Sequence, residues 1–242
     1  MSNGETAVVV GAVGAMGQVI SHRLVANGLR VVAVGRSADT LASLTATSSD
    51  VIACPADIAN DSAIDAIRAK LDGPVRMVVQ AAGVATAGGV LTAPTAAVVD
   101  AVNIKVGGML RLVRAVDERL GTQARLVAIG GHYGVEPTAY AATAGVANAA
   151  LVNLVRQLSW AYGSRGITAH LVAPGPADTE RLRRVAADGA TRDGITPETV
   201  LSGNAQGIHD RRLHDRRTGR LGYRHLACSR GRRDGRQHAL HG

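Results

Sequence analysis

The chain has 242 residues, of which 46% are hydrophobic, and a net charge of +8. This length suits one α/β domain with a substantial core. There is no Arg-rich or signal-like leader and no apolar run of about 18 or more residues, so we expect a cytoplasmic protein without a membrane segment. Two cysteines, Cys54 and Cys228, are too few for a disulfide framework or a metal cluster, and we expect no metal site.

The positive charge is concentrated at the C-terminal end. Residues 209–242 hold ten Arg against three Asp, together with five of the eight His. The preceding residues are therefore almost neutral, and the composition changes near residue 205. We expect a folded domain over residues 1–204, followed by a basic Arg/His-rich tail over residues 205–242.

The first predicted element is a buried strand at residues 6–10, which leads into a glycine-rich turn and a helix. Glycine tolerates positive φ and lets backbone amides approach a ligand. The free N–H groups and the dipole of the following helix suit a pyrophosphate. An ordinary βα turn can have the same composition, so the turn alone does not decide between the two interpretations. The candidate cofactor-binding residues are Gly11, Val13, Gly14, Ala15, Met16 and Gly17.

A second predicted strand, residues 31–34, is followed by Arg36. An acidic residue at this junction would bind the ribose 2′-hydroxyl of NAD, whereas an arginine can pair with the 2′-phosphate of NADP. Arg36 is therefore a candidate cofactor-binding residue that favours NADP, with NAD as the other possible cofactor. The alternative is that Arg36 is a solvated loop charge.

Strands and helices continue to alternate along the chain. Further strands are predicted at 51–54, 75–80, 125–129 and 167–172, and helices at 39–46, 61–71, 95–120 and 139–162. Apolar strands separated by helices predict a parallel sheet covered on both faces, which is a three-layer, Rossmann-like αβα fold. Ligands bind such a doubly wound sheet at the carboxyl ends of its strands.

Motifs in order and spacing resemble the short-chain dehydrogenase/reductase family over about residues 5–182. The resemblance begins with a G-x-x-x-G-x-G turn at residues 11–17 that has Ala15 for one glycine, and continues with an N-N-A-G-like turn at residues 80–83. It implies hydride transfer between NAD(P) and a small-molecule carbonyl or alcohol. By position in the family's motifs, it implies cofactor-binding roles for Asp57, Ile58, Ala81, Ala82, Gly83, Pro174, Gly175 and Thr179.

The catalytic set of the family is incomplete in this chain. The resemblance implies that Tyr140 is the general acid/base and that Asn103 supports a water or backbone relay. The family's Lys, four residues after the Tyr, is replaced by Ala144, and the family's Ser after the fifth strand is replaced by Gly131. Since a cation near a tyrosine favours its phenolate, these replacements predict weak activity. A catalytically silent nucleotide-binding protein, either a degenerate copy or a cofactor sensor, is the alternative.

Other residues could supply the missing polar groups. Lys105 lies two residues after Asn103, on a helix face about 200° away, so we expect it to be a poor substitute for the missing lysine. Thr143 could supply a hydroxyl and His132 a proton, although a small helix-packing residue and a loop residue are the simpler interpretations of these two.

Three interpretations of the basic tail stay open. When residues 213–220 and 234–240 are back-translated and shifted by one base, the degenerate codons permit stretches that resemble the family's next helix and final strand, so a frame shift near residue 205 is the preferred hypothesis. A plain disordered tail and a nucleic-acid-binding arm are the others, and the scarcity of aromatic residues counts against the arm.

A shifted tail would have consequences for the fold. The sheet would lose its final strand, and the strand at residues 167–172 would become an exposed edge. We therefore expect marginal stability or poor solubility, and a homo-oligomer only if the C-terminal part folds.

Overall fold

A computed structural model describes residues 4–84 and 88–175, and ten residues between positions 183 and 199, of which 183, 186, 187, 190, 191 and 197–199 are helical. The chain divides into two units, Met1–Leu182 and Arg183–Gly242. The description that follows concerns the first unit. The predicted boundary at residues 204 and 205, and the basic tail beyond it, lie outside the described residues.

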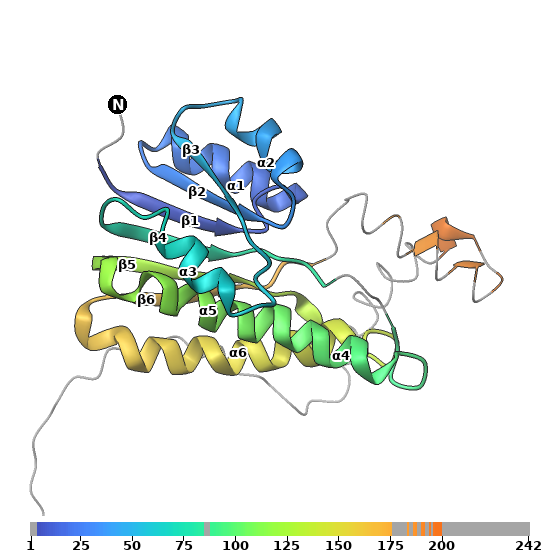
Figure 1. The fold of residues 1–242 in the computed structure, drawn as a ribbon. Helices are drawn as coiled ribbons and strands as arrows, with labels where there is room; N and C mark the ends of the chain where they lie inside the picture. Colours follow the sequence, from blue (N-terminus) through green and yellow to red (C-terminus); the bar gives the residue numbers. More distant parts are fainter. Residues whose placement is uncertain are drawn as a thin grey trace, which may run out of the picture. The chain divides into compact units, whose positions relative to one another are not determined.

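The first unit is a parallel sheet with the strand order β3-β2-β1-β4-β5-β6 (Figure 1). Its strands are β1 (Thr6–Val10), β2 (Arg30–Gly35), β3 (Val51–Pro55), β4 (Val75–Gln80), β5 (Leu120–Ile129) and β6 (Thr168–Val172). The α-helices are α1 (Ala15–Ala26), α2 (Ala38–Thr45), α3 (Ser62–Arg68), α4 (Thr95–Val102), α5 (Gly108–Val116) and α6 (Ala142–Tyr162). β2 and β3 follow β1 toward one edge of the sheet, and β5 and β6 follow β4 toward the other edge. This is the strand order of a doubly wound nucleotide-binding sheet. The predicted fold class is confirmed.

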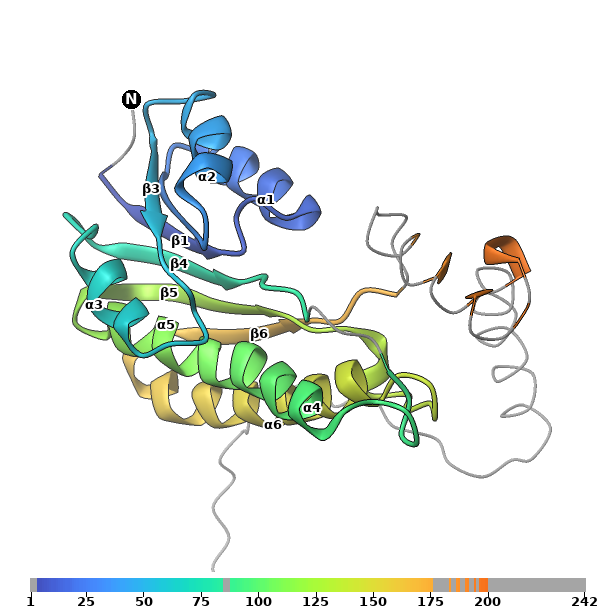
Figure 2. The same ribbon diagram turned by 45° about the vertical axis from the view of Figure 1, so that its right-hand side comes forward.

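Each face of the sheet has its own core. Val8 and Val10 of β1 pack on the face covered by α3, α5 and α6, whereas Ala7 and Val9 pack on the face covered by α1 and α2. This alternation follows from the two-residue period of a strand. All four side chains are buried, as expected for a parallel strand covered on both faces. Figure 2 shows the two helical layers on either side of the sheet.

The predicted helix over residues 95–120 is interrupted. Between α4 and α5 the backbone forms a π-helical segment, η1 (Asn103–Gly107), and a short 3-10 turn (Asp117–Arg119) follows α5. A π-helical segment changes the angular spacing of the side chains that follow it and is frequent at functional sites. The expectation of one regular α-helix was therefore wrong, and Lys105 lies within the interruption.

Other predicted boundaries also differ from the structure, and α3 ends at Arg68, three residues before the predicted end. β5 begins at Leu120, five residues before the predicted start, and its pairing with β4 is irregular between Leu120 and Arg125, where Gln123 has a positive φ of 67°. The polar residues before Arg125 concealed this first part of the strand. Helix α6 begins at Ala142, so Tyr140 lies in the segment before the helix and not in its first turn.

β6 lies at the edge of the described sheet, next to β5. Residues on β6 alternate between exposed and half-buried, and Val172 is 47% exposed. Within the described residues no strand pairs with the outer side of β6, which leaves its backbone groups open to pairing. In the same part of the chain, no helix is long and apolar enough to span a membrane.

Candidate functional site

The carboxyl ends of β1 and β4 meet where the strand order reverses. The Ala81 N–H donates to the Val10 carbonyl (3.0 Å), which joins the segment after β4 to the end of β1. Gly11 has a φ of +74°, and a Cβ on it would lie 2.9 Å from the Ala82 nitrogen. Two segments predicted to bind the cofactor are therefore in direct contact, and only glycine fits at position 11.

The glycine turn presents the N-terminus of α1 to this edge of the sheet. A Cβ on Gly17 would lie 2.1 Å from the Gly11 carbonyl oxygen, so the first turn of α1 packs directly on the turn backbone. Gly14 caps α1 and provides no side chain over the helix end. Gly14 and Ala15 are exposed, and Val13 and Met16 are half-buried beside them. The arrangement leaves backbone N–H groups and the positive end of the helix dipole available to an anion.

Arg36 directly follows β2 and is exposed. None of the ion pairs among the described residues includes Arg36. The neighbouring Ser37 caps α2 by accepting a hydrogen bond from the Thr40 N–H (3.4 Å). The guanidinium is thus free to pair with a phosphate group at the end of β2.

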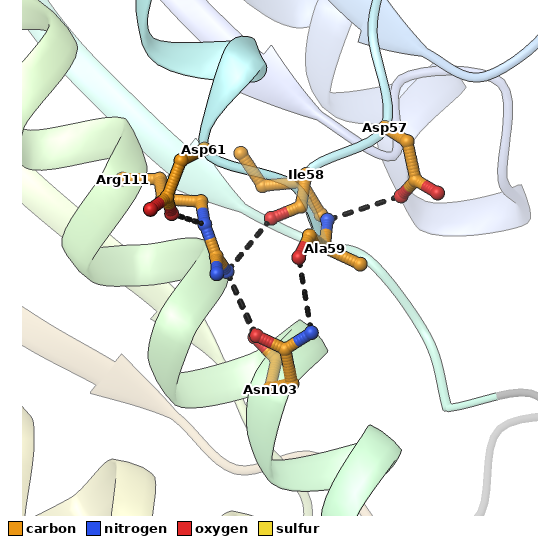
Figure 3. Close-up of polar contacts among 6 residues, drawn as sticks. All are labelled: Asp57, Ile58, Ala59, Asp61, Asn103 and Arg111. Atoms are coloured by element: carbon orange, nitrogen blue, oxygen red, sulfur yellow. Dashed lines mark hydrogen bonds and ion pairs between the residues drawn. The ribbon is translucent and has the colours of Figure 1, made fainter.

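The loop after β3 is held in shape by its own carboxylate and by the helix opposite (Figure 3). Asp57 accepts a hydrogen bond from the Ala59 N–H (3.0 Å). Ile58 is 5% exposed, and its carbonyl accepts from the Arg111 guanidinium (3.1 Å). Arg111 also pairs with Asp61 (2.6 Å). The exposed Asp57 carboxylate and the buried Ile58 side chain therefore have fixed positions at the sheet edge.

Asn103 takes part in the same network (Figure 3). Its Nδ2 donates to the Ala59 carbonyl (3.0 Å), and its Oδ1 accepts from the Arg111 guanidinium (2.9 Å). The Nδ2 end therefore joins η1 directly to the loop after β3, and the Oδ1 end bonds to Arg111 of α5, which itself donates to the Ile58 carbonyl of that loop. These contacts do not include Tyr140, so a role of Asn103 in a catalytic relay stays a prediction.

Gln80 connects the end of β4 to η1. It is fully buried, its Oε1 accepts from the Ala82 N–H (3.1 Å), and its Nε2 donates to the Ile104 carbonyl (2.9 Å). A Cβ on Gly108 would lie 2.3 Å from Gln80 Nε2, so the glycine makes room for the amide. Gln80 therefore fixes the turn formed by Ala81, Ala82 and Gly83, in which Gly83 is exposed.

Tyr140 is paired with a second tyrosine. The two hydroxyl groups of Tyr133 and Tyr140 lie 3.1 Å apart, and their rings meet edge to face with centroids 5.7 Å apart. Burial, followed by the hydrogen bond and charge of Tyr140, raises the pKa of Tyr133 above its ordinary value. Tyr133 therefore keeps its proton at a pH at which an exposed tyrosine begins to ionise, and its O–H can donate a hydrogen bond to Tyr140. Tyr140 itself is 48% exposed and accessible to a ligand.

His132 and Thr143 were the other candidates for supplying missing polar groups. The His132 ring packs on the Tyr133 ring with centroids 3.8 Å apart, and its backbone N–H donates to the Pro174 carbonyl (3.3 Å). Thr143 is 1% exposed. The burial of Thr143 agrees with a packing role.

Two polar side chains converge on the carboxyl end of β5. Lys105 is 6% exposed, and its Nζ donates to the Ile129 carbonyl (2.7 Å). Asn148 of α6 is also 6% exposed, and its Nδ2 lies 2.9 Å from the position that a Cβ on Gly131 would take. As expected, Asn103 and Lys105 lie on different faces, because Asn103 faces the loop after β3 and Lys105 faces β5. The expectation that Lys105 is a poor substitute for the missing lysine stays a prediction.

The segment after β6 is described only in part. The Pro174 carbonyl accepts from the His132 N–H, and among the described residues no atom beyond the chain neighbours of Gly175 lies within 4 Å of the position that a Cβ on it would take. Thr179, the remaining predicted cofactor-binding residue, lies outside the described residues.

Comparison with known proteins gives the same family along the chain. A family model described as short chain dehydrogenase matches residues 5–189. The chain is 28% identical to the 3-oxoacyl-acyl-carrier-protein reductase FabG of Salmonella typhimurium, covering 85% of this chain and 86% of that protein. It is 27% identical to the 2,3-dihydro-2,3-dihydroxybenzoate dehydrogenase of Bacillus subtilis, covering 73% and 71% of the two chains.

Solved structures show the same fold. The L-sorbose reductase of Gluconobacter frateurii, solved with NADPH and L-sorbose, superposes with a TM-score of 0.73 at 20% identity, over 86% of this chain and 83% of that one. A blue fluorescent protein from a metagenomic library, solved with NADPH, gives a TM-score of 0.64 at 26% identity, over 77% and 82% of the two chains.

The glycine turn, the strand order and the match over most of the chain agree with one another. The chain belongs to the short-chain dehydrogenase family of oxidoreductases.

Proposed function

We propose that this protein is an NADP-dependent oxidoreductase that interconverts the carbonyl and alcohol forms of a small molecule, with low activity. The observation that carries the proposal is the contact between the glycine turn and the segment after β4, at the point where the strand order reverses. Doubly wound sheets bind dinucleotides in that crevice.

NADP fits the described residues. The N-terminus of α1 suits the pyrophosphate, the exposed Arg36 suits the 2′-phosphate, and the fixed Asp57 and Ile58 suit the adenine side. Two structurally similar proteins were solved with NADPH. When bound, NADPH supplies the hydride, and the chain supplies position and proton control.

Tyr140 is the proposed general acid/base. Its hydroxyl holds the proton that the substrate oxygen takes up on reduction, and its exposure lets a small molecule approach. Tyr133, which stays protonated, donates its O–H toward Tyr140 Oη when Tyr140 has given up its proton. This hydrogen bond stabilises the phenolate without a cation at position 144. A hydroxyl stabilises a phenolate less than an ammonium does, which is the physical reason for expecting low activity.

The substrate of the proposed reaction is a small-molecule carbonyl or alcohol. We also expect a homo-oligomer if the C-terminal part of the chain folds, in which the exposed Trp160 of α6 and Val99 of α4 are apolar groups that a second copy could cover.

The test of the proposed function is NADPH consumption with a panel of aldehydes and ketones, measured on the full chain and on Tyr140→Phe. Turnover that falls by about 10²-fold or more in Tyr140→Phe, with NADPH binding unchanged, supports the proposal. NADPH binding with no turnover on any carbonyl would favour the silent nucleotide-binding alternative. Absence of NADPH binding would overturn the proposal.

A further inference from the structure

The carboxyl end of β5 carries two buried polar groups that the proposed reaction does not yet use. Lys105 enters from η1, and Asn148 enters from α6. Lysine is almost never buried without a specific reason, because removing an ammonium group from water is costly. One interaction of the buried Lys105 ammonium group is the hydrogen bond that its Nζ donates to the Ile129 carbonyl at 2.7 Å.

Asn148 provides an independent observation. Its Oδ1 is buried and has no hydrogen-bond donor among the described residues. This oxygen lies 3.8 Å from the Cβ position of Gly130, the residue after Ile129. A buried acceptor without a partner normally has a water or ligand as its partner. The Lys105 ammonium group therefore lies beside Ile129, and the unpaired Asn148 Oδ1 lies beside the next residue, Gly130.

The glycines at this strand end make room for the amide. A Cβ on Gly131 would lie 2.9 Å from Asn148 Nδ2, and a Cβ on Gly134 would lie 2.7 Å from Asn148 Cβ. In the family, position 131 is where the resemblance places a serine hydroxyl. In this chain the space beside position 131 is occupied by a polar group that comes from α6 instead.

We propose that Lys105 and Asn148 form a hydroxyl-binding site at the carboxyl end of β5. A hydroxyl is both donor and acceptor, so one group can donate to Asn148 Oδ1 and accept from Lys105 Nζ. Its position at the carboxyl edge of the sheet places the site where doubly wound sheets hold their ligands. The hydroxyl belongs either to the alcohol form of the substrate or to a ribose of the cofactor. This inference rests on the proposed function only in that it takes the substrate and the cofactor as the two possible sources of the hydroxyl.

The substrate arm of the test uses the full chain without cofactor. Benzyl alcohol and toluene, which differ by the hydroxyl, are titrated and followed by ligand-observed NMR. Lys105→Met and Asn148→Ala should weaken benzyl alcohol binding at least tenfold and leave toluene binding unchanged. Lys105→Arg, which keeps the charge and the donors, should retain part of the affinity. Lys70→Met and Asn153→Ala are the matched controls, because both residues are exposed.

The cofactor arm compares NADPH with adenosine 2′,5′-bisphosphate, which lacks the nicotinamide half. If the site holds the ribose on the nicotinamide side, Lys105→Met and Asn148→Ala weaken NADPH at least tenfold and leave the bisphosphate unchanged. Thermal melts identify any variant that fails to fold, and Asn148→Ala then carries the test alone.

Selective weakening of benzyl alcohol or of NADPH supports the site and identifies the source of the hydroxyl. Unchanged affinities for both in folded variants overturn it. If the unmodified chain binds no NADPH, the proposed function fails, and the benzyl alcohol arm still decides the hydroxyl site.

Discussion

A Cβ on Gly17 would lie 2.1 Å from the carbonyl oxygen of Gly11, so the first turn of α1 and the glycine turn fit together only without a side chain at position 17. We predict that Gly17→Ala displaces the turn and abolishes NADPH binding, with a destabilisation of about 1–3 kcal/mol. Fluorescence titration and a thermal melt measure both effects. Gly163→Ala is the control, because in the described part of the chain no atom beyond its local backbone and chain neighbours lies within 4 Å of its Cβ position. Normal NADPH affinity in Gly17→Ala would contradict the assignment of the turn.

The tyrosine pair predicts a graded loss of turnover. Tyr140→Phe removes the proposed acid/base and should lower kcat by about 10²–10⁴-fold. Tyr133→Phe removes only the hydroxyl that lies 3.1 Å from Tyr140 Oη, and it should lower kcat by a smaller factor, of about 10. Tyr162→Phe, at the other end of α6, should leave kcat unchanged. Equal losses in Tyr133→Phe and Tyr162→Phe would show that the Tyr133 hydroxyl does not act on Tyr140.

Tyr162 predicts a loss of stability at alkaline pH. It donates to Asp117 (3.0 Å), and burial, followed by that hydrogen bond and the Asp117 charge, raises the pKa of Tyr162 to about 12 against the opposing effect of Arg165. An unfolded tyrosine titrates near 10. Between about pH 10 and 12 the folded state binds more protons than the unfolded state, so stability falls as the pH rises.

The measurement is the unfolding midpoint in urea from pH 8 to pH 11.5. Tyr162→Phe should be less stable at pH 8, by about 1 kcal/mol for the lost hydrogen bond, and should lose less stability than the unmodified chain as the pH rises. Parallel pH profiles for the two proteins would show that Tyr162 is not a source of the alkaline loss.

The close approach of Asn148 to position 131 predicts a coupled pair of substitutions. Gly131→Ser places a Cβ 2.9 Å from Asn148 Nδ2 and should destabilise the protein by about 1–3 kcal/mol. Asn148→Ala removes the obstructing amide, so the double variant should be more stable than the sum of the single effects, with a coupling of about 0.5 kcal/mol or more. A double-mutant cycle of thermal melts measures this coupling. Strict additivity would mean that the two positions do not contact.

Much of the fold could be predicted from local patterns. Apolar strands alternating with helices predicted the parallel sheet, because a strand covered on both faces must be apolar on both. The glycine pattern predicted that the turn after β1 packs closely against the start of α1, and the structure leaves no space for a side chain at positions 11 and 17. The family resemblance over residues 5–182 was confirmed by a family model that matches residues 5–189.

The polar groups at the end of β5 could not be predicted in the same way. A regular helix was assumed through residues 95–120, and no local composition identified the π-helical segment η1. Asn148 meets position 131 only through the packing of α6 beside β5, which no spacing in the sequence specifies. The long β5 was shortened in the prediction because Thr122 and Gln123 do not follow an apolar pattern.

The most direct test of the NADP-dependent function is a fluorescence titration of the full chain and of Arg36→Ala with NADPH and NADH. Arg36 is exposed at the end of β2 and belongs to none of the ion pairs among the described residues. A charge-assisted contact to a phosphate contributes about 1.5–3 kcal/mol, so Arg36→Ala should weaken NADPH about 10- to 100-fold. The affinity for NADH should stay the same, and Arg23→Ala should change neither. Tighter binding of NADH than of NADPH by the unmodified chain, or equal loss of both in Arg36→Ala, would contradict the NADP-dependent function proposed for this chain.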